Sequence, residues 1–289
     1  MKPVSRLRQL LAQGNLIIAP GAFDCISAKA VEQAGFPAIY MTGMGTSASR
    51  LGLPDYGLAT MSEMVANASA MTTAVEIPVI ADADTGYGNE LNMARTVREY
   101  ERHGIAGIHM EDQVFPKKCG HLGQKQVISQ SAFISKLKAA VDARVNPDFV
   151  IIARTDANSV LGFEEAIDRA NAALEAGADL ALVEAPESLE QLRSVPDMVN
   201  GPCVLNVLVG GKSPLLPLLE VAGMGYRMTL LSDLLLATAI SAYDRILHTV
   251  HDTQRSLRSE GAMTPQQIFS RLGSEYWDQL RTEPVEISG

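Results

Sequence analysis

Short apolar runs alternate with longer amphipathic stretches along almost the whole chain. Eight runs rich in β-branched residues recur, and each is followed by a small or polar residue and then by about ten to fifteen residues with helical periodicity. The pattern predicts eight βα units, with strands over Leu16–Ala19, Ala38–Met41, Val79–Ala81, Gly107–Met110, Phe149–Ala153, Leu180–Val183, Cys203–Val207 and Met228–Leu231.

The stretches between the runs carry helix start and stop signals. Asp24 is an expected N-cap for a helix over Ile26–Ala34, which Gly35 ends. Gly177 likewise ends an expected helix over Phe163–Ala176. Eight successive units without a break in composition favour a closed (β/α)8 TIM barrel over an open doubly wound sheet, because each parallel strand needs its own covering helix.

The C-terminal part departs from this repeat. After a long helix expected from Asp233 to about Arg258, the tail has apolar positions of its own, among them Phe269 and Trp277. We expect the apolar side chains of such a tail to pack against another surface. We therefore predict a catalytic barrel domain over residues 1–260 and a C-terminal helical tail over residues 261–289.

The bulk composition excludes several classes of partner. The 289 residues include 33 acidic and 24 basic ones, so the net charge of -9 would repel nucleic acid and anionic membranes. Three widely spaced cysteines argue against a disulfide framework or a closed zinc site and fit a reducing compartment. No signal peptide, membrane span or glycine-rich nucleotide motif is found, so we expect a cytoplasmic protein.

Polar residues gather where the predicted strands end, which is where barrel enzymes place their catalytic groups. From the second strand to the seventh they are Tyr40, Thr42 and Gly43; Asp82 and Asp84; His109, Glu111 and Asp112; Arg154, Thr155 and Asp156; Glu184; and Asn206.

Three of these acids predict a metal site. Asp82 and Asp84 are one residue apart and therefore point the same way on a strand, and Glu111 ends the adjacent strand. Oxygen ligands of this kind select Mg2+ or Mn2+ and leave coordination positions for water and substrate. Singly, each acid is equally compatible with a helix cap or a surface position.

A carboxylate-binding group is expected beside the acids. Arg154 at a strand end suits bidentate pairing with a carboxylate, and Glu184 and Asn206 are placed to orient it or the substrate. An ion pair that ties loops together is the alternative for Arg154. Thr42 and Gly43 offer a hydroxyl and a backbone N–H, although the glycine equally fits a tight turn.

The segment Pro116–His121 is polar and contains glycine, which indicates a mobile loop over the barrel mouth. Cys119 lies between lysines and a histidine, so we expect its thiolate to be favoured and its thiol to transfer protons. Cys25 and Cys203 are instead interpreted as small buried apolar residues.

These residues resemble the isocitrate lyase and phosphoenolpyruvate mutase superfamily over almost the whole chain. The loop Lys117–His121, with the letters KKCGH, is similar to that of the lyase branch, which includes methylisocitrate lyases and 2-alkylmalate lyases. The other matching segments are Ala19–Asp24, Thr42-Gly43, Leu51–Asp55, Asp82–Gly88, Glu111–Gln113, Ala153–Ala157 and Asn206.

The resemblance implies specific roles. It implies Mg2+ at Asp82, Asp84 and Glu111, with Asp55 holding a metal-bound water, and a 2-oxo acid held by Thr42, Gly43, Met44 and Arg154. It places Tyr40 near the substrate hydroxyl and makes Cys119 the catalytic acid, with Lys117 and His121 as further catalytic residues and Gly120, Glu184 and Asn206 as further substrate-binding ones. It also implies a homotetramer whose last helices swap between neighbouring subunits.

Two segments depart from the lyase branch. Val209 stands where these lyases commonly have glutamate, so a polar pocket wall is expected to be apolar. The stretch Tyr40–Ser47 is closer to carboxyphosphonoenolpyruvate mutase.

Our hypothesis is an enzyme that cleaves a di- or tricarboxylate of the malate type, a 2-alkylmalate or methylisocitrate-like acid, to a 2-oxo acid and a carboxylic acid. The alternatives are a phosphonomutase, an oxaloacetate decarboxylase or hydrolase, and a barrel that only senses a metal-chelated keto acid.

Overall fold

A computed structural model describes residues 2–255 and 261–280. Eight parallel strands pair in chain order, and β1 pairs with β8, so the sheet closes into the predicted barrel. The strands are β1 (Ile17–Ala22), β2 (Ile39–Met41), β3 (Val79–Asp82), β4 (Gly107–Glu111), β5 (Val150–Thr155), β6 (Leu180–Val183), β7 (Cys203–Val207) and β8 (Met228–Leu231).

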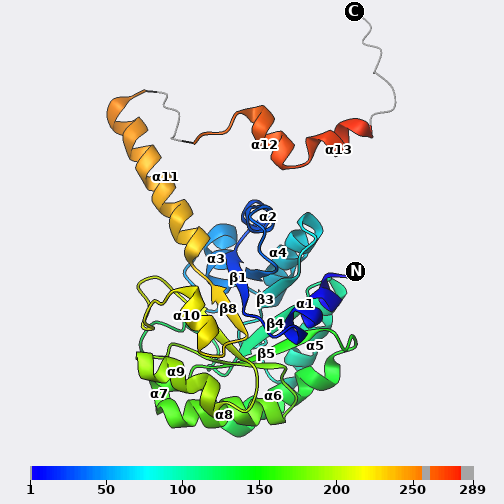
Figure 1. Ribbon diagram of the computed structural model, residues 1–289, viewed down its shortest axis with the longest axis vertical. Helices are drawn as coiled ribbons and strands as arrows, with labels where there is room; N and C mark the ends of the chain where they lie inside the picture. Colours follow the sequence, from blue (N-terminus) through cyan, green and yellow to red (C-terminus); the bar gives the residue numbers. More distant parts are fainter. Residues whose placement is uncertain (1, 256–260, 281–289) are drawn as a thin grey trace, which may run out of the picture. The chain divides into compact units, whose positions relative to one another are not determined.

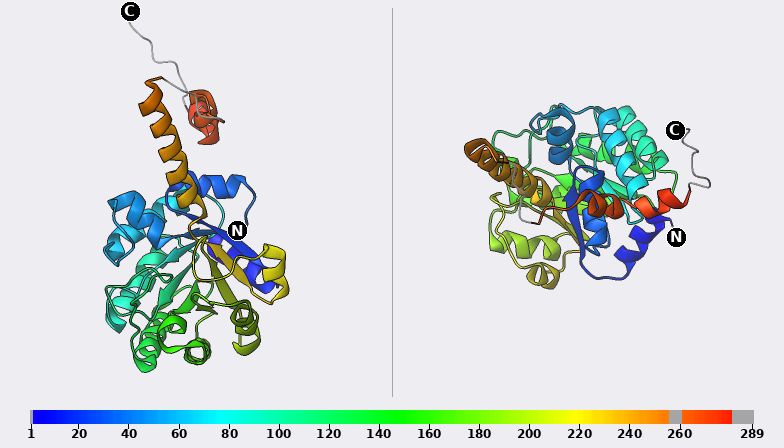
Figure 2. Two further views of the ribbon diagram at one scale, coloured as in Figure 1. Left: turned by 90° about the vertical axis from the view of Figure 1, so that its left-hand side faces the viewer. Right: turned by 90° about the horizontal axis from the view of Figure 1, so that it is seen from above.

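The helices between the strands, α2 to α10, lie outside the barrel (Figures 1 and 2). The helices of the described chain are α1 (Pro3–Ala12), α2 (Cys25–Gln33), α3 (Gly43–Thr46), the π-helix η1 (Ser47–Leu51), α4 (Met61–Ala74), α5 (Glu90–Arg102), α6 (Gln130–Ala143), α7 (Asn158–Leu161), α8 (Phe163–Glu175), α9 (Leu189–Met198), α10 (Leu218–Gly223), α11 (Leu234–Thr253), α12 (Pro265–Arg271) and α13 (Ser274–Gln279). In the described part of the chain, none is both long and apolar enough to span a bilayer.

The predicted helix signals act locally as expected. Asp24 caps α2 by accepting the backbone N–H of Ser27, whose hydroxyl in turn accepts the Asp24 N–H. Gly35 follows α2 with a φ of 85°, and Gly177 follows α8 with a φ of 104°, a region that glycine enters without a Cβ penalty.

β1 runs further than predicted. It continues through Pro20 to Ala22, although proline usually ends a strand because it lacks an N–H donor. Gly21 permits this extension, since a Cβ there would lie 2.7 Å from Thr42 Cγ2 and 2.8 Å from the Ser232 carbonyl carbon. The ends of β1, β2 and β8 can therefore approach closely on this side of the barrel.

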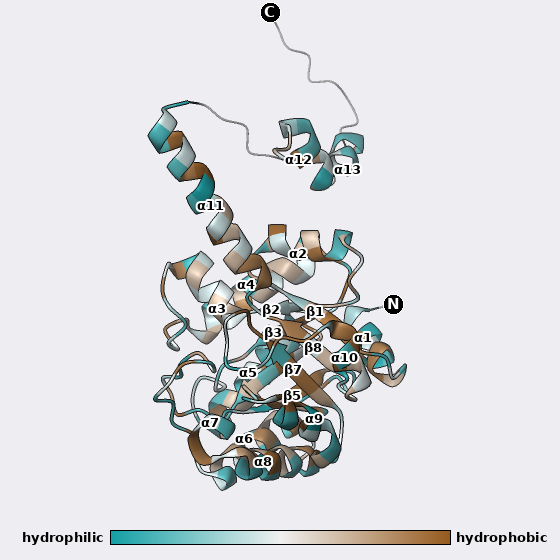
Figure 3. Cartoon of the chain, turned by 60° about the vertical axis from the view of Figure 1, so that its left-hand side comes forward, coloured by the Kyte–Doolittle hydropathy of each residue, from teal (hydrophilic) through white to brown (hydrophobic). Residues whose placement is uncertain are grey.

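The apolar core lies between the strands and the inward faces of the helices. Phe133, Tyr100 and Leu192, from three different helices, are fully buried. Each helix also presents polar residues to solvent, and teal and brown residues alternate along α8 in Figure 3.

The chain forms two compact units, Met1–Thr238 and Ala239–Gly289, which divide within α11. In the second unit, α12 and α13 contact each other, and the rings of Tyr276 and Trp277 meet edge to face at 5.5 Å. α11 ends at Thr253, before the predicted end at about Arg258, a position that lies outside the described residues.

The N-terminal end of the barrel is held by an ion cluster. Asp179, just before β6, pairs with Arg8 of α1 at 2.7 Å and with Arg144 at 2.8 Å, and it also accepts the backbone N–H of Ile151. Arg8 further donates to the Phe149 carbonyl. The cluster ties α1 to β5 and β6 at the end of the barrel opposite the polar strand ends.

We expect Asp179→Asn to lower the free energy of unfolding by about 1–2 kcal/mol, because both arginines lose their shared carboxylate. Urea denaturation followed by circular dichroism measures the change. Asp142→Asn, an equal loss of charge at an exposed position of α6, is the control. Equal losses in the two variants would show that the cluster contributes nothing specific.

Candidate active site

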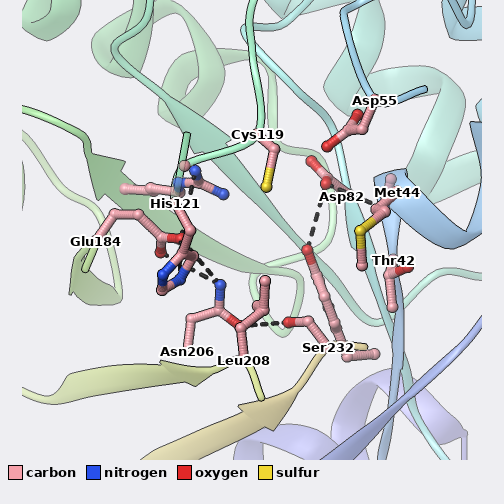
Figure 4. Close-up of a pocket in the computed structure, with 14 residues that line it drawn as sticks. Thr42, Met44, Asp55, Asp82, Cys119, His121, Glu184, Asn206, Leu208 and Ser232 are labelled. Atoms are coloured by element: carbon pink, nitrogen blue, oxygen red, sulfur yellow. Dashed lines mark hydrogen bonds and ion pairs between the residues drawn. The ribbon is translucent and has the colours of Figure 1, made fainter. Parts of the chain in front are cut away.

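The polar strand ends converge on one cavity at the C-terminal end of the barrel. Residues from β2, β3, β5, β7, the loop after β4 and several other strand-end loops line it (Figure 4). They are Tyr40, Thr42, Gly43, Met44, Asp55, Asp82, Cys119, Gly120, His121, Arg154, Glu184, Asn206, Leu208 and Ser232.

Twelve of the predicted site residues line this cavity, and the other three lie directly behind it. Lys117 and Asp84 form an ion pair with each other, and Glu111 contacts Arg154. The prediction missed two lining residues, Leu208 and Ser232. Ser232 directly follows β8 and was accessible to the strand-end argument, whereas an apolar residue such as Leu208 carries no chemical signal.

The acid cluster surrounds a buried ammonium group. Lys117 Nζ lies 2.5 Å from Asp55 Oδ1 and 2.9 Å from Asp84 Oδ1. Burial lowers the pKa of Lys117, but the charges of Asp84 and Asp55 outweigh it and hold the pKa well above its usual value. Lys117 is therefore a fixed cation within the acid cluster, and it does not line the cavity.

The backbone is strained beside two of the acids. Asp84 has a φ of 46°, and Ala185, directly after Glu184, has a φ of 55°. Such conformations cost roughly 1–2 kcal/mol for residues other than glycine. The surrounding fold thus stabilises the exact direction in which these strand ends leave the barrel, as is typical of functional sites.

The buried charges do not balance. The buried charged side chains among the described residues are six acids (Asp82, Asp84, Glu111, Asp112, Asp156 and Glu184) and five cations (Lys117, Lys125, Lys136, Arg154 and Arg169). Burial raises the pKa of Asp84 to about 6, with Asp82 and Asp55 adding to it, and burial raises the pKa of Glu111 well above its usual value. These two carboxyls therefore lack sufficient positive charge around them.

This donor set fits a hard divalent cation. Oε1 of Glu111 is buried without a hydrogen-bond or ion-pair partner among the described residues, whereas its Oε2 has only the ion pair with Arg154 and Oδ1 of Asp84 only the ion pair with Lys117. Glu111 is adjacent to Asp84, whose carbonyl accepts its N–H. No group of three His, Cys, Asp or Glu side chains in the described ranges is arranged to hold an ion alone. The residues match a cation that keeps water and substrate ligands, as Mg2+ does.

Tyr40 connects the cavity to a buried histidine. Its phenol oxygen lies 2.5 Å from His109 Nε2 and 3.3 Å from Asp82 Oδ2. Burial raises the pKa of Tyr40 well above its usual value, and the Asp82 charge adds to this, so the phenol is protonated at neutral pH. Burial raises the pKa of Asp82 too, but His109 and Lys117 outweigh it and hold that pKa below its usual range.

Thr42 and Gly43 have local partners as well as positions at the cavity. The Thr42 hydroxyl caps α3 by accepting the N–H of Gly45, and the Gly43 N–H donates to Asp82 Oδ2. A Cβ at position 43 would overlap Asp82, so only glycine allows this close approach.

Arg154 is surrounded by acidic side chains. Asp156 accepts its Nε and Nη2 at 2.9 and 3.1 Å, and Glu111 and Glu184 lie 3.3 and 3.6 Å away. Burial lowers the pKa of Arg154, but these carboxylates outweigh it and keep the guanidinium charged. Asn206 donates to Glu184, so these side chains form a connected polar network.

The loop that carries Cys119 is packed against the barrel. Lys117 is buried, and His121 Nε2 lies 3.2 Å from Glu184 Oε1. Figure 4 shows the Cys119 sulfur directed into the cavity. The prediction that its thiolate is favoured is wrong: burial raises the pKa of Cys119. The nearby cations do not prevent this, because Lys117 is paired with acids and His121 faces Glu184.

Val209 does not form the apolar wall. Its side chain is 64% exposed, and its backbone N–H donates to Asp233. Leu208, one residue earlier, lines the cavity instead, because successive residues leaving a strand point in opposite directions. The expected apolar wall is therefore present, but at position 208.

Comparison with known proteins shows which proteins this chain is similar to. A family model described as phosphoenolpyruvate phosphomutase matches residues 7–251. The chain is 49% identical over 230 residues to 2,3-dimethylmalate lyase of Eubacterium barkeri, which covers 80% of each protein. It is 40% identical over 284 residues to 2-methylisocitrate lyase of Aeropyrum pernix, which covers 98% of this chain and 91% of that protein.

Solved structures match over the full fold. Oxaloacetate acetylhydrolase in complex with the inhibitor 3,3-difluorooxalacetate superposes with a TM-score of 0.93 at 39% identity, over 97% of both chains. Phosphonopyruvate hydrolase in complex with oxalate and Mg2+ superposes with a TM-score of 0.87 at 30% identity, over 98% of this chain and 99% of that one. The similar proteins named lyases support a carbon–carbon lyase.

Proposed function

Because the chain belongs to the phosphoenolpyruvate mutase and isocitrate lyase superfamily, we propose that it is a Mg2+-dependent carbon–carbon lyase. Its substrate is a malate-type 2-hydroxy acid with an alkyl substituent, which it cleaves to a 2-oxo acid and a carboxylic acid. One observation carries this proposal: the Cys119 thiol faces the cavity that Arg154 and Asp82 line, and burial keeps that thiol protonated.

Asp82, Asp84 and Glu111 would hold the metal, with Asp55 contributing through a water molecule. Their buried negative charge and the unpartnered Oε1 of Glu111 support this assignment. When bound, the metal supplies Lewis-acid polarisation of the substrate oxygens. Lys117 forms ion pairs with Asp55 and Asp84 and so holds both carboxylates in position.

Arg154 pairs with the substrate carboxylate, and Thr42, Gly43 and Met44 form the facing wall. Glu184 and Asn206 orient Arg154 and the far end of the substrate. Leu208 and Met44 are apolar, which favours a small alkyl group over a further carboxylate at that end.

Cleavage needs one proton acceptor and one proton donor. Tyr40 takes the hydroxyl proton while its own phenol proton moves to His109 Nε2. The electron pair left on oxygen forms the new C=O bond, the C2–C3 bond breaks, and its electron pair passes to C3 as the enolate of the departing carboxylate. The Cys119 thiol donates its proton to C3. Solvent then reprotonates the thiolate; the proton on His109 returns to Tyr40 as Tyr40 releases one proton to solvent, which regenerates the starting state.

A second activity is favoured by the solved structures. The superposition on oxaloacetate acetylhydrolase includes the whole barrel, so hydrolysis of oxaloacetate on the same site is the alternative to lyase activity. Incubation of the enzyme with a series of 2-alkylmalates, malate and oxaloacetate in Mg2+ separates the two. The lyase releases a 2-oxo acid from alkylmalates, whereas the hydrolase releases oxalate and acetate from oxaloacetate.

The metal assignment predicts that exhaustive treatment with a chelator abolishes turnover and that Mg2+ or Mn2+ restores it better than Zn2+ does, because the ligands are oxygen atoms. Asp84→Asn should reproduce the effect of the chelator. Asp168→Asn, at an exposed position of α8, is the control for loss of one negative charge. Full turnover after chelation would remove the metal from the mechanism.

Replacing the proton donor tests the lyase assignment. Cys119→Ser should reduce lyase turnover by roughly two to four orders of magnitude, because a hydroxyl is far less acidic than a thiol. Calorimetry should still detect oxalate binding, since those contacts belong to Arg154, Thr42 and the metal. Cys25→Ser, a thiol outside the cavity, should retain activity. Near-normal turnover in Cys119→Ser would move the proton donor elsewhere.

We also propose a homotetramer in which residues 261–289 form a tail that packs on a neighbouring subunit. Phe269 and Trp277 are 60% and 65% exposed, an unusual exposure for such large apolar side chains. Light scattering should give about four times the chain mass of 31.0 kDa. Trp277 is the only tryptophan, so its fluorescence should also be blue-shifted in the native protein. A monomeric mass with solvent-exposed fluorescence would contradict this assembly.

A further inference from the structure

Lys125 is a buried lysine that does not line the cavity. It lies on the returning limb of the Cys119 loop, and its side chain is 1% exposed. The loop begins and ends in an antiparallel bridge between Gln113 and Val127, so Lys125 emerges two residues from a fixed base. A charged side chain is buried at such a position only if its partners compensate for the lost hydration.

The Lys125 ammonium has two partners that belong to different parts of the site. It donates to the carbonyl of Gly120, the residue that directly follows Cys119. It also pairs with Asp156 Oδ1 at 2.7 Å. The same ammonium therefore joins the tip of the loop to the end of β5.

Asp156 is a rigid anchor for this contact. Its two oxygens accept Arg154, and its backbone N–H donates to Asp112, which in turn pairs with Arg169 of α8 at 2.9 Å. Burial raises the pKa of Asp156, but Arg154 and Lys125 outweigh it and keep the carboxylate ionised. Lys125 and Arg154 thus share one buried carboxylate.

The loop tip at Gly120 packs closely against side chains of the cavity. A Cβ at Gly120 would overlap the Arg154 guanidinium and lie 2.5 Å from Glu184 Oε1. Other tip contacts include the ion pairs of Lys117 with the acid cluster and the contact of His121 with Glu184, which are groups that metal or substrate would also engage. Two hydrogen bonds between the Gln113 side chain and the Lys118 backbone hold the loop on its other limb. The contact made by Lys125 ends on Asp156, which does not line the cavity.

We propose that Lys125 is a positioning residue that holds the Cys119 loop closed and, through the shared Asp156 carboxylate, couples that closed position to the orientation of Arg154. This inference rests on the proposed function, because it explains how the thiol is kept at the far end of a substrate that Arg154 binds. Lys125 itself touches neither the substrate nor the reacting atoms.

The test compares Lys125→Met with Lys138→Met, which removes the same charge from an exposed position of α6. Iodoacetamide labels thiols, and peptide mass spectrometry gives the labelling rate of Cys119 with and without oxalate and Mg2+. In Lys125→Met we expect labelling to be about tenfold faster and no longer slowed by oxalate, because the loop no longer stays closed. Lys138→Met should match the wild type.

Turnover provides the second measurement. In Lys125→Met, kcat should fall roughly 10- to 100-fold, since a displaced donor is costly, while KM and oxalate affinity change by less than about threefold. Lys125→Arg, which retains the charge and the donors, should recover most of the closure. If Lys125→Met does not fold, as judged by circular dichroism, Lys125→Gln serves in its place.

Two outcomes separate the inference from the function on which it rests. Labelling and kcat within about twofold of the wild type in the folded variant would show that Lys125 only balances charge, and would overturn the inference. A wild-type enzyme without lyase turnover would instead refute the proposed function. The labelling comparison would still decide whether Lys125 closes the loop.

Discussion

Burying more carboxylates than cations at one end of a barrel is the constraint on which this site depends. Each ionised acid withdrawn from water must be compensated, and in this chain lysine and arginine side chains compensate for only some of them. Asp82, Asp156 and Glu184 have cationic neighbours that hold their pKa values low. For Asp84 and Glu111, burial outweighs the charges of Lys117 and Arg154 beside them, and their raised pKa values mark the place where further positive charge is needed.

The same distribution of charge determines the state of the thiol. Lysines beside a cysteine in the sequence favour a thiolate only if their charge reaches the sulfur. In the fold, Lys117 turns to Asp55 and Asp84, and Lys125 turns to Asp156. Cys119 is left with a burial cost and stays protonated. A protonated thiol at the cavity can act as a general acid that protonates a carbanion, whereas a nucleophile would have to be the thiolate.

The site consists of residues held by the barrel strands and residues carried by the loop after β4. Arg154, Asp156 and Glu184 lie on or directly after barrel strands, where paired backbone fixes them. Cys119, Gly120 and His121 lie on a loop whose base is bridged but whose tip depends on side-chain contacts. Closure of such a loop excludes water from the reaction and brings the proton donor to the substrate.

The sequence by itself determined the barrel and most of the site. Apolar runs of strand length, each followed by a capped helix, fit only a closed array of βα units, and polar residues at strand ends must then meet at one mouth. This reasoning located Asp82, Arg154 and Glu184 without coordinates. It needed only periodicity and the common direction of parallel strands, which are local properties of the chain.

Only the tertiary structure decided which charges pair and which side chains face the cavity. Periodicity does not indicate that Lys117 contacts Asp55, or that Lys125 contacts Asp156, because these partners are far apart in the chain. The end of β7 was predicted correctly at Val207, but periodicity does not give the direction of the side chains after the strand, so Val209 was assigned a wall that Leu208 forms. The reason is physical: pairing and protonation depend on distances and burial, which arise only when separate segments pack together.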